Sequence, residues 1–425
     1  MFMLTRNASA NRGTSYSGAV AALDVGTTKV TCLLARTGAN GKISVTGIGH
    51  HLSRGVKAGA VVDMAATEAS IRAAVDGAER MANDVIRSVY VNLSAGQQRS
   101  QTIGVEVAVA GNAVSDSDTR RAIEHAMVRA EVGSREVIHA IPLQYSIDGA
   151  NGIRDPRGMF GSKLGVSLHL VTTEASHLRN LAICVGRGHL DVQAAVASGY
   201  ASALATLVED ERDLGATVID MGGGVTSIAV FADGGPVLID TVGIGGQHVT
   251  SDIARGLGTS LSIAERTKTL YGSAVSGPSD ERELIDVPPV GEAVKGGGNP
   301  VPRAELVRII RPRIEELFEH VRDRLRSSGC DEIAGKRVVL TGGASQLDGV
   351  MEVAARVLDR QVRPGRPLGV DGLAESASGP AFATCAGMLR YAAGGFADVD
   401  VGALGGADRG GSTLARMGRW LKQHF

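Results

Sequence analysis

Residues 216–231 read ATVIDMGGGVTSIAVF, in which an apolar, β-branched run ends at Asp220 and a second run resumes after three glycines. Residues 21–35 read AALDVGTTKVTCLLA and repeat this arrangement, with Asp24 ending the first run and Gly26 following two residues later. Each stretch predicts a β-hairpin with a turn of small residues. Such a turn lets backbone N–H groups approach an anion, and a carboxylate at the strand end can hold a hydrated divalent cation. Two such hairpins facing each other would hold a nucleotide's phosphates from both sides.

A single glycine turn between two strands is usually only a turn, but its repetition favours a phosphate-binding role. A third segment, residues 338–348, reads VVLTGGASQLD and ends another apolar strand at Gly342 and Gly343. The order of hairpin, hairpin and Thr-Gly-Gly resembles that of the actin and Hsp70 ATPases. This resemblance implies ATP and Mg²⁺ as cofactors, with the nucleotide bound between two lobes.

Other motifs narrow the resemblance to one family. They are EDERDLG at 209–215, GIGGQHVTSDI at 243–253, AERTK at 264–268, HAIPLQY at 139–145, DPRG at 155–158 and SGPAFAT at 378–384. Together they are similar to the FtsA family of bacterial cell-division proteins, over about residues 19–394. The implied fold is α/β, an actin-like two-lobed ATPase fold with an FtsA-type inserted subdomain in the first lobe.

The resemblance also implies a set of nucleotide-binding residues. Asp24 and Asp220 would hold Mg²⁺ through water. Glu265 and Lys268 stand at i, i+3 spacing and would contact the adenosine, although such a pair is more often a solvated helix face. The full set for ATP is Asp24, Gly26, Thr27, Thr28, Lys29, Asp220, Gly222, Gly223, Gly224, Thr226, Glu265, Lys268, Gly342, Gly343 and Ser345.

The chain divides into ten expected segments. Residues 1–18 form a disordered start, and 98–173 are the inserted subdomain, for which the alternative is a plain extension of the first lobe. The first lobe also takes 19–97, 174–213 and 366–393; the second lobe takes 214–245 and 305–365, with a small subdomain at 246–304; 394–411 are a flexible linker and 412–425 a terminal helix.

Several elements are predicted within this frame. Helices are expected at 63–83, 115–131, 174–186, 248–257, 261–271 and 380–392, and further strands at 43–51, 88–94, 102–110, 137–145 and 164–171. An Ala-rich helix at 194–209 should connect the lobes, and a long helix at 303–328 should be interrupted at Pro312.

Composition excludes several classes of protein. The chain has 425 residues, enough for two lobes, and a formal net charge of −1, so nucleic acid is not an expected partner. Its four cysteines, Cys32, Cys184, Cys330 and Cys385, lack metal-ligand spacing and are expected to be reduced core residues. No signal peptide or membrane span is predicted, which indicates a soluble cytoplasmic chain.

The terminal helix is predicted to be amphipathic. A Gly-rich linker precedes it, and the protein's one tryptophan lies in it. A tail helix commonly packs on its own domain, but the basic opposite face favours an anionic membrane surface. Its apolar face comprises Leu414, Met417, Trp420, Leu421 and Phe425, and its basic residues are Arg416, Arg419 and Lys422.

The FtsA resemblance implies a polymer that tethers the FtsZ ring to the inner face of the cytoplasmic membrane at the division septum. Its implied partners are the FtsZ C-terminal tail, other copies of the chain, and downstream division proteins. Ser198 stands where chaperone relatives carry a catalytic carboxylate, so slow turnover is expected and the catalytic base stays unassigned. A small-molecule kinase or another actin-like polymer protein, in pilus assembly or plasmid partition, remains the alternative.

Overall fold

The structure is a computed structural model that describes residues 18–38, 41–111, 113–291, 299–394 and 398–399. The predicted terminal helix at 412–425 and nearly all of the predicted disordered start and linker lie outside these residues. In the described residues, no helix is both long enough and apolar enough to cross a bilayer.

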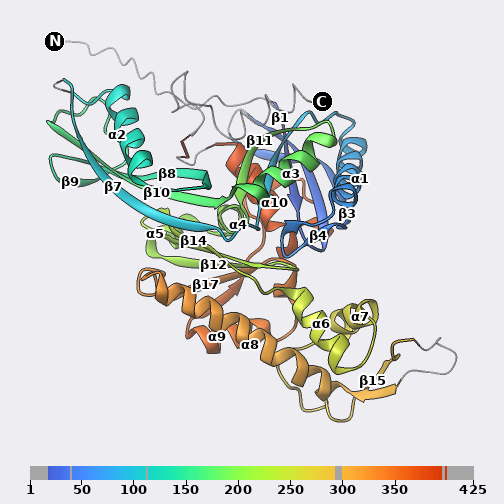
Figure 1. Cartoon of the computed structure of the whole chain (residues 1–425). Helices are drawn as coiled ribbons and strands as arrows, with labels where there is room; N and C mark the ends of the chain where they lie inside the picture. Colours follow the sequence, from blue (N-terminus) through green and yellow to red (C-terminus); the bar gives the residue numbers. More distant parts are fainter. Residues whose placement is uncertain (1–17, 39–40, 112, 292–298, 395–397, 400–425) are drawn as a thin grey trace.

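The first lobe is built on a six-stranded mixed sheet in the order β11-β6-β1-β2-β3-β19 (Figure 1). The first predicted hairpin is its centre, because β1 and β2 pair antiparallel with Asp24 opposite Thr31. Its strands are β1 (Ala19–Val25), β2 (Lys29–Thr37), β3 (Ile43–Leu52), β6 (Ser88–Leu93), β11 (Asp191–Ala197) and β19 (Val370–Asp371), beside a short pair, β4 (Val56–Lys57) and β5 (Ala60–Val61).

Alternation along β1 places apolar side chains on both faces of this sheet. Ala21 and Leu23 face a core formed with α1 (Met64–Ala82) and α3 (Ala175–Arg187). Ala22 faces the opposite core, which includes α4 (Ser198–Thr206) and α10 (Ala383–Ala392). A strand with apolar residues at every position is expected where helices cover both faces of a sheet.

The second lobe repeats this design with a five-stranded sheet in the order β14-β13-β12-β17-β18. One face packs against α8 and α9, and the other packs against the same α4 that covers the first sheet. All nine residues of α4 are buried, so this helix fills the layer between the two sheets (Figure 1). The elements are β12 (Ala216–Met221), β13 (Thr226–Ala232), β14 (Gly235–Val242), β17 (Arg337–Thr341), β18 (Gln361–Pro364), α5 (Glu209–Leu214), α8 (Arg303–Ser327) and α9 (Val350–Leu358).

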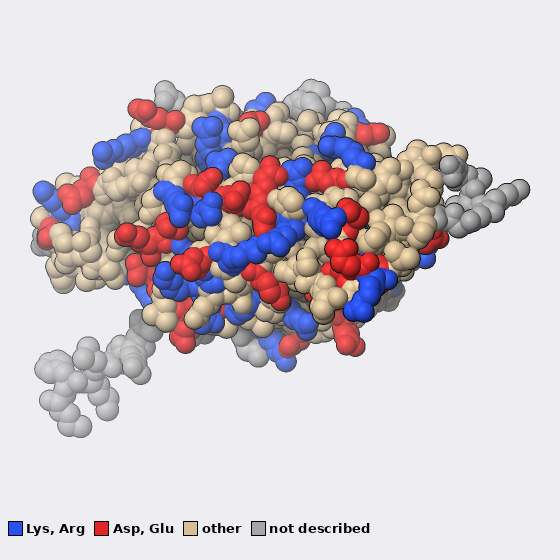
Figure 2. All heavy atoms as spheres, turned by 90° about the horizontal axis from the view of Figure 1, so that it is seen from below, with Lys and Arg blue, Asp and Glu red and all other residues tan. Residues whose placement is uncertain are grey.

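The remaining elements form a small region beyond α8 and three short turns. α6 and α7 pack together and on α8, beside a two-stranded pair. The elements are α6 (Gly246–Gly256), α7 (Leu261–Tyr271), β15 (Leu284–Val287) and β16 (Asn299–Pro302), with 3₁₀ turns η1 (Gly343–Gln346), η2 (Glu375–Ala377) and η3 (Pro380–Phe382). Seen from below, basic and acidic side chains are interspersed, so this face offers no field of one sign (Figure 2).

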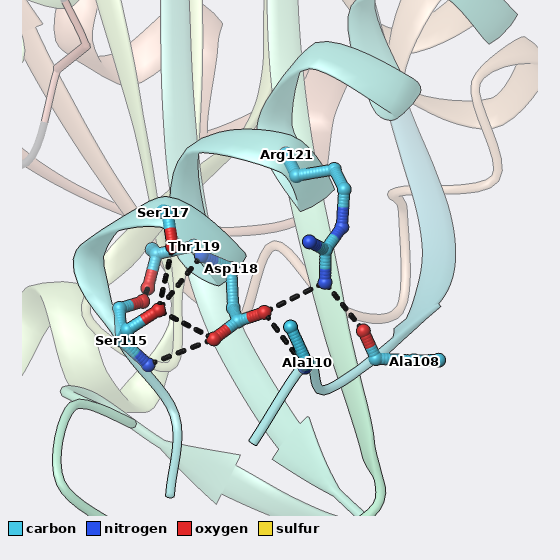
Figure 3. Close-up of polar contacts among 7 residues, drawn as sticks. All are labelled: Ala108, Ala110, Ser115, Ser117, Asp118, Thr119 and Arg121. Carbon is cyan, nitrogen blue, oxygen red and sulfur yellow. Dashed lines mark hydrogen bonds and ion pairs between the residues drawn. The ribbon is translucent and has the colours of Figure 1, made fainter.

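An inserted four-stranded antiparallel sheet, ordered β7-β10-β8-β9, extends from the first lobe and carries α2 (Figure 1). α2 begins with a capping box: Ser115 Oγ accepts from the Asp118 N–H, and the Asp118 carboxylate accepts from the Ser115 N–H (Figure 3). Arg121 donates to Asp118 and to the Ala108 carbonyl, which joins the cap to the end of β7. The bounds are β7 (Arg99–Ala108), α2 (Asp116–Arg129), β8 (Arg135–Ile147), β9 (Ala150–Ile153) and β10 (Lys163–Glu174).

Two element predictions were wrong. The single helix at 194–209 is instead the end of β11 followed by α4 and α5, because Ala195 and Ala197 pair in parallel with β6. Strand pairing therefore overrides the helical preference of alanine. The helix at 303–328 is not interrupted: α8 runs as 25 residues through Pro312, which is exposed, while the neighbouring Ile310 and Ile314 are buried. Burial on the opposite face offsets the hydrogen bond that proline cannot make.

Candidate functional site

A concavity with a volume of about 600 Å³ lies between the two lobes. The turns of both glycine hairpins line it, together with the loop that follows β17 and one face of α7. The three segments that the sequence singled out therefore meet around one space, although nearly two hundred residues separate the first from the second.

The turn between β1 and β2 is tight and polar. The Gly26 N–H donates to the Lys29 carbonyl at 3.0 Å, and a Cβ at Gly26 would lie 2.9 Å from that same oxygen. Thr27 Oγ1 accepts from the Gly59 N–H at 3.0 Å, which fixes the turn against the loop between β4 and β5. The close approach at Gly26 leaves no room for a side chain.

The turn between β12 and β13 touches the first turn. A Cβ on Gly223 would lie 2.5 Å from Thr28 Cγ2, and one on Gly224 would lie 2.6 Å from Thr27 Oγ1 and 2.8 Å from Ala58 Cα. Both glycines therefore let the hairpin tips of the two lobes come into direct contact. Gly222 and Gly223 also accept, through their carbonyls, the N–H groups of Gly246 and Gln247 at the start of α6.

Two buried carboxylates stand at the strand ends. Asp24 is 9% exposed and Asp220 is 7% exposed. Burial raises the pKa of Asp24 to about 7, which the Lys29 charge opposes and the Asp220 charge reinforces. Burial also raises the pKa of Asp220, although hydrogen bonds from Ser202 and Thr384 act in the opposite direction. A divalent cation between them would stabilise the ionised form of both groups.

The two carboxylates differ in how they are held. Asp220 Oδ2 accepts from Ser202 Oγ at 2.5 Å and from Thr384 Oγ1 at 2.8 Å, so α4 and α10 both fix its position. Lys29 supplies the nearby positive charge, and its Nζ lies 3.4 Å from the centroid of the Phe382 ring. Burial lowers the pKa of Lys29.

The loop after β17 closes another side of the cavity. Gly342 adopts φ +86°, and a Cβ there would collide with Asp220 Oδ1. Its N–H donates to the Pro380 carbonyl at 3.1 Å, which ties the loop to η3, the turn just before α10. Only glycine satisfies both the backbone angle and the close approach.

Glu265 and Lys268 are not a freely solvated pair. Lys268 Nζ donates to Glu265 Oε2 at 2.8 Å, to Thr250 Oγ1 at 2.8 Å and to the Gly246 carbonyl at 3.2 Å. The Lys268 side chain is 15% exposed, whereas that of Glu265 is 50% exposed. Both residues belong to α7 and line the same cavity as the two aspartates.

Thirteen of the fifteen predicted nucleotide-binding residues line this cavity. Thr226 and Ser345 do not: Thr226 Oγ1 donates to the Ile244 carbonyl, and Ser345 Oγ donates to the Gly342 carbonyl. The eight predicted membrane-contacting residues lie outside the described part of the chain. Within that part, no three His, Cys, Asp or Glu side chains form a group that could hold a metal ion.

Sequence reasoning did not name several polar residues that line the cavity. Asn92 lies near the end of β6, accepts from the Val25 N–H at 2.7 Å and donates to Ser198 Oγ at 3.2 Å. Thr384 and Arg303 also line it. Thr384 falls within the SGPAFAT motif, and a polar residue at the end of an apolar strand is the signal that identifies Asn92. In the described residues, the carboxylates lining the cavity are Asp24, Asp220, Glu265 and Asp348.

Comparisons with known proteins agree over most of the chain. The family model described as "Cell division protein FtsA" matches residues 217–387, and the one described as "SHS2 domain inserted in FTSA" matches residues 95–172. The cell-division protein FtsA of Agrobacterium fabrum strain C58 is 46% identical over 421 residues, which cover 96% of this chain and 95% of that protein. FtsA of Escherichia coli K12 is 33% identical over 420 residues, covering 96% and 98%.

Solved structures show the same fold at low identity. The chain in the "PilM-PilN type IV pilus biogenesis complex" aligns with a TM-score of 0.63 at 17% identity, covering 88% of this chain and 98% of that one. MreB5 of Spiroplasma citri bound to AMPPNP aligns with a TM-score of 0.51 at 12% identity, covering 87% and 94%. These likenesses establish the actin-like two-lobed fold.

Proposed function

Because the chain belongs to the FtsA family of cell-division proteins, we propose that it is an actin-like, ATP-binding polymer protein that tethers the FtsZ ring to the membrane. It would assemble on the cytoplasmic face of the bacterial inner membrane at the septum and recruit later division proteins. The observation that carries the proposal is the convergence of two glycine hairpins, the β17 loop and the Glu265–Lys268 pair on one interlobe cavity.

The cavity fits a nucleoside triphosphate on three counts. Its volume of about 600 Å³ is in the range of small-molecule sites. The turns at Gly26 and at Gly222 to Gly224 are too crowded for added side chains, so a ligand in the cavity would meet their backbone at close range. Lys29 and Lys268 would add positive charge at the phosphate end and the nucleoside end respectively, and MreB5, which shares the fold, is bound to AMPPNP.

Asp24 and Asp220 would hold Mg²⁺ through its water shell. Mg²⁺ keeps several waters and is usually held by one or two carboxylates together with substrate phosphates. Two buried aspartates at facing strand ends match that requirement. When bound, the cation would neutralise phosphate charge; Ser202 and Thr384 would keep Asp220 oriented toward it.

Turnover is proposed to be slow. Ser198 begins α4 and accepts a hydrogen bond from Asn92, and a serine without a basic partner is a poor proton acceptor at neutral pH. ATP would then act mainly as an assembly ligand that holds both lobes together. Steady-state hydrolysis far slower than nucleotide exchange is the expected kinetic signature.

Anchoring rests on the sequence of residues 412–425. Burial of five apolar side chains contributes at most about 1.5–3 kcal/mol each, and three basic residues add about 1 kcal/mol each near anionic lipid. Ordering costs roughly 1.5 kcal/mol per residue, so the net for one tail is small. One tail would bind reversibly, and a row of tails on a polymer would bind much more tightly through effective concentration.

Two other surfaces are proposed from family membership. The small subdomain, residues 246–304, would bind the FtsZ C-terminal tail. The inserted subdomain, residues 98–173, would contact neighbouring copies and downstream division proteins. Deleting residues 98–173 should abolish normal polymerisation; a folded deletion variant that still polymerised normally would contradict the second assignment.

Sedimentation with anionic lipid vesicles tests the proposal, with and without ATP and FtsZ. We expect the wild-type chain to pellet with vesicles and to carry FtsZ with it. Trp420→Glu should stay in the supernatant while still binding ATP. The matched control is Gln423→Glu, which adds the same charge on the opposite helix face and should still pellet. Full sedimentation of Trp420→Glu would contradict the anchor.

A further inference from the structure

A cluster of aromatic side chains and one carboxylate surrounds residues 398–399, the last residues that the structure describes. Asp398, whose side chain is 8% exposed, accepts from the Ala140 N–H at 2.9 Å and from Tyr391 Oη at 2.7 Å, and it lies 2.6 Å from His139 Nδ1. The next residue, Val399, donates its N–H to the Ala140 carbonyl at 2.9 Å. Residues 398–399, which sequence analysis assigned to a flexible linker, are therefore fixed against β8.

His139 connects Asp398 to the residue that precedes α4. The Ala197 N–H, which can only donate, points at His139 Nε2 at a distance of 3.0 Å. Nε2 must then carry the lone pair, so the ring proton is on Nδ1 and is donated to Asp398. His139 is fully buried. The Asp398 carboxylate thereby selects the one histidine tautomer that can accept from Ala197, the residue just before Ser198.

The same two helices hold both this cluster and the cavity. On α4, Tyr200 contacts the His139 ring with centroids 5.0 Å apart, and Ser202 donates to Asp220. On α10, Tyr391 donates to Asp398, and Thr384, seven residues earlier and on the same helix face, donates to Asp220. Each helix therefore carries one residue that contacts the Asp398 cluster and one hydroxyl group that donates to the Asp220 carboxylate.

Packing between these helices makes the connection stiff. A Cβ on Gly387 of α10 would collide with the Ala201 carbonyl of α4, so the two backbones touch. All of α4 is buried, and Tyr200 and Tyr391 also contact each other, with ring centroids 6.3 Å apart. Close-packed elements of this kind shift together, so a change at one end is felt at the other.

We propose that Asp398 is a positioning residue that couples the docking of residues 398–399 on β8 to the interlobe cavity, acting through His139, α4 and α10. Coupling of this kind is reciprocal. A ligand that binds at Asp220 would stabilise the contacts of Asp398, and loss of those contacts would lower the affinity for the ligand. The statement about ATP rests on the proposed nucleotide binding. The connection from Asp398 to α4 does not.

Asp398→Asn is the sharpest probe, because it preserves shape and removes acceptor capacity. Whichever way the amide is turned, its NH₂ group faces either the Ala140 N–H or the His139 and Tyr391 donors. Tyr391→Phe removes one donor and keeps the ring, which gives a milder second variant. Asp371→Asn is the matched control. Asp371 lies on β19, forms an ion pair with Lys42 and has a side chain that is 56% exposed.

Hydrogen exchange on the full chain without nucleotide tests the connection. In Asp398→Asn we expect faster exchange at the amides of Val399, Ala140 and Ala197, with a smaller increase in Tyr391→Phe and none in Asp371→Asn. If exchange became faster at Val399 and Ala140 but stayed the same at Ala197, the Asp398 contacts would be only local, and the proposed coupling would be wrong. An unprotected Val399 amide in the wild-type chain would remove the anchor itself.

Binding of a fluorescent ATP analogue then tests the functional consequence. At a temperature where circular dichroism shows both chains fully folded, Asp398→Asn should bind it about fivefold or more weakly than the wild-type chain, and Asp371→Asn should match the wild type. Equal affinity of Asp398→Asn and wild type would refute the coupling to the cavity. If the wild-type chain itself bound no analogue, nucleotide binding would fail, and the exchange data would still decide the connection to α4.

Discussion

The two glycine hairpins have the same backbone design and different chemical support. The first presents Asp24 beside Lys29, so its carboxylate is balanced by a charge on its own hairpin. The second presents Asp220, which accepts hydrogen bonds from Ser202 and Thr384 on two helices from outside the hairpin. Duplication of a fold unit therefore does not duplicate its electrostatics, and the second carboxylate depends on helices that belong to the layer between the lobes.

The contact between the hairpin tips gives the largest expected effect. Gly224→Ala places a Cβ 2.8 Å from Ala58 Cα and 2.9 Å from Ala58 N, so backbone must move. We expect loss of ATP binding by a factor of about 100 or more, because the two turns could no longer share one ligand. Gly243→Ala is the control, since its Cβ would meet nothing within 4 Å. Equal affinities for both variants would show that the tips need not touch.

Asp24 in the first hairpin should make the stability of the nucleotide-free protein depend on pH. Asp24 has its pKa raised from 3.8 to about 7, so between these values the folded protein holds a proton that the unfolded chain has lost. Stability therefore falls as pH rises through this window, by up to about 4 kcal/mol. Without nucleotide or Mg²⁺, Asp24→Asn should be more stable than wild type at pH 8 and close to it at pH 4. Denaturant titrations at both pH values measure this.

Asp220→Asn provides the comparison for Asp24→Asn. Its stabilising effect at pH 8 should be smaller, because the Asp220 carboxylate already accepts two hydroxyl hydrogen bonds that favour its ionised form. An equal or larger gain at Asp220 would contradict the difference between the two hairpins.

Removing one of those hydroxyl groups should have an intermediate effect. Thr384→Val keeps the shape of the side chain and deletes the 2.8 Å hydrogen bond to Asp220, which is worth about 1.5–3 kcal/mol for a charged acceptor. Affinity for ATP should fall along with stability, because Asp220 loses part of its orientation. Calorimetric melting together with ligand titration would measure both; loss of stability at unchanged affinity would assign Thr384 a purely structural role.

The smallest expected effect lies far from both hairpins. Ser115→Ala removes the N-cap of α2 and should cost about 0.5–2 kcal/mol in the inserted sheet. ATP binding should not change, because α2 packs on β7 and β10 of the inserted sheet and does not line the cavity. A fall in nucleotide affinity in this variant would mean that the inserted subdomain is coupled to the cavity, and the distinction between the regions would need revision.

The hairpins and the cavity could be predicted because their signals are local. Asp24, Asp220 and Gly342 each stand at the end of an apolar strand, and the order of the three turns identifies the superfamily. The structure adds the contacts that no local pattern contains. Ser202 and Thr384 are 182 residues apart and meet at Asp220, and the strand at 194–197 exists only because β6 lies beside it.

Residue 398 is a second place where a local pattern does not predict the tertiary contacts. Gly and Ala around residue 398 predict a linker, and composition alone gives no sign that Asp398 meets His139, 259 residues away. A lone aspartate in a linker has no periodic pattern, so only the tertiary structure reveals its three partners. Pro312 is a comparable case. The proline alone predicts an interrupted helix, but burial of its helix neighbours keeps α8 continuous.

Direct titration with a fluorescent ATP analogue and Mg²⁺ tests whether the interlobe cavity binds ATP through both hairpins. The wild-type chain should bind saturably. Asp220→Ala should lose binding while circular dichroism and sedimentation show an intact fold, because the variant removes the carboxylate and retains the glycine turn. Unchanged binding by folded Asp220→Ala would contradict the assignment of the site.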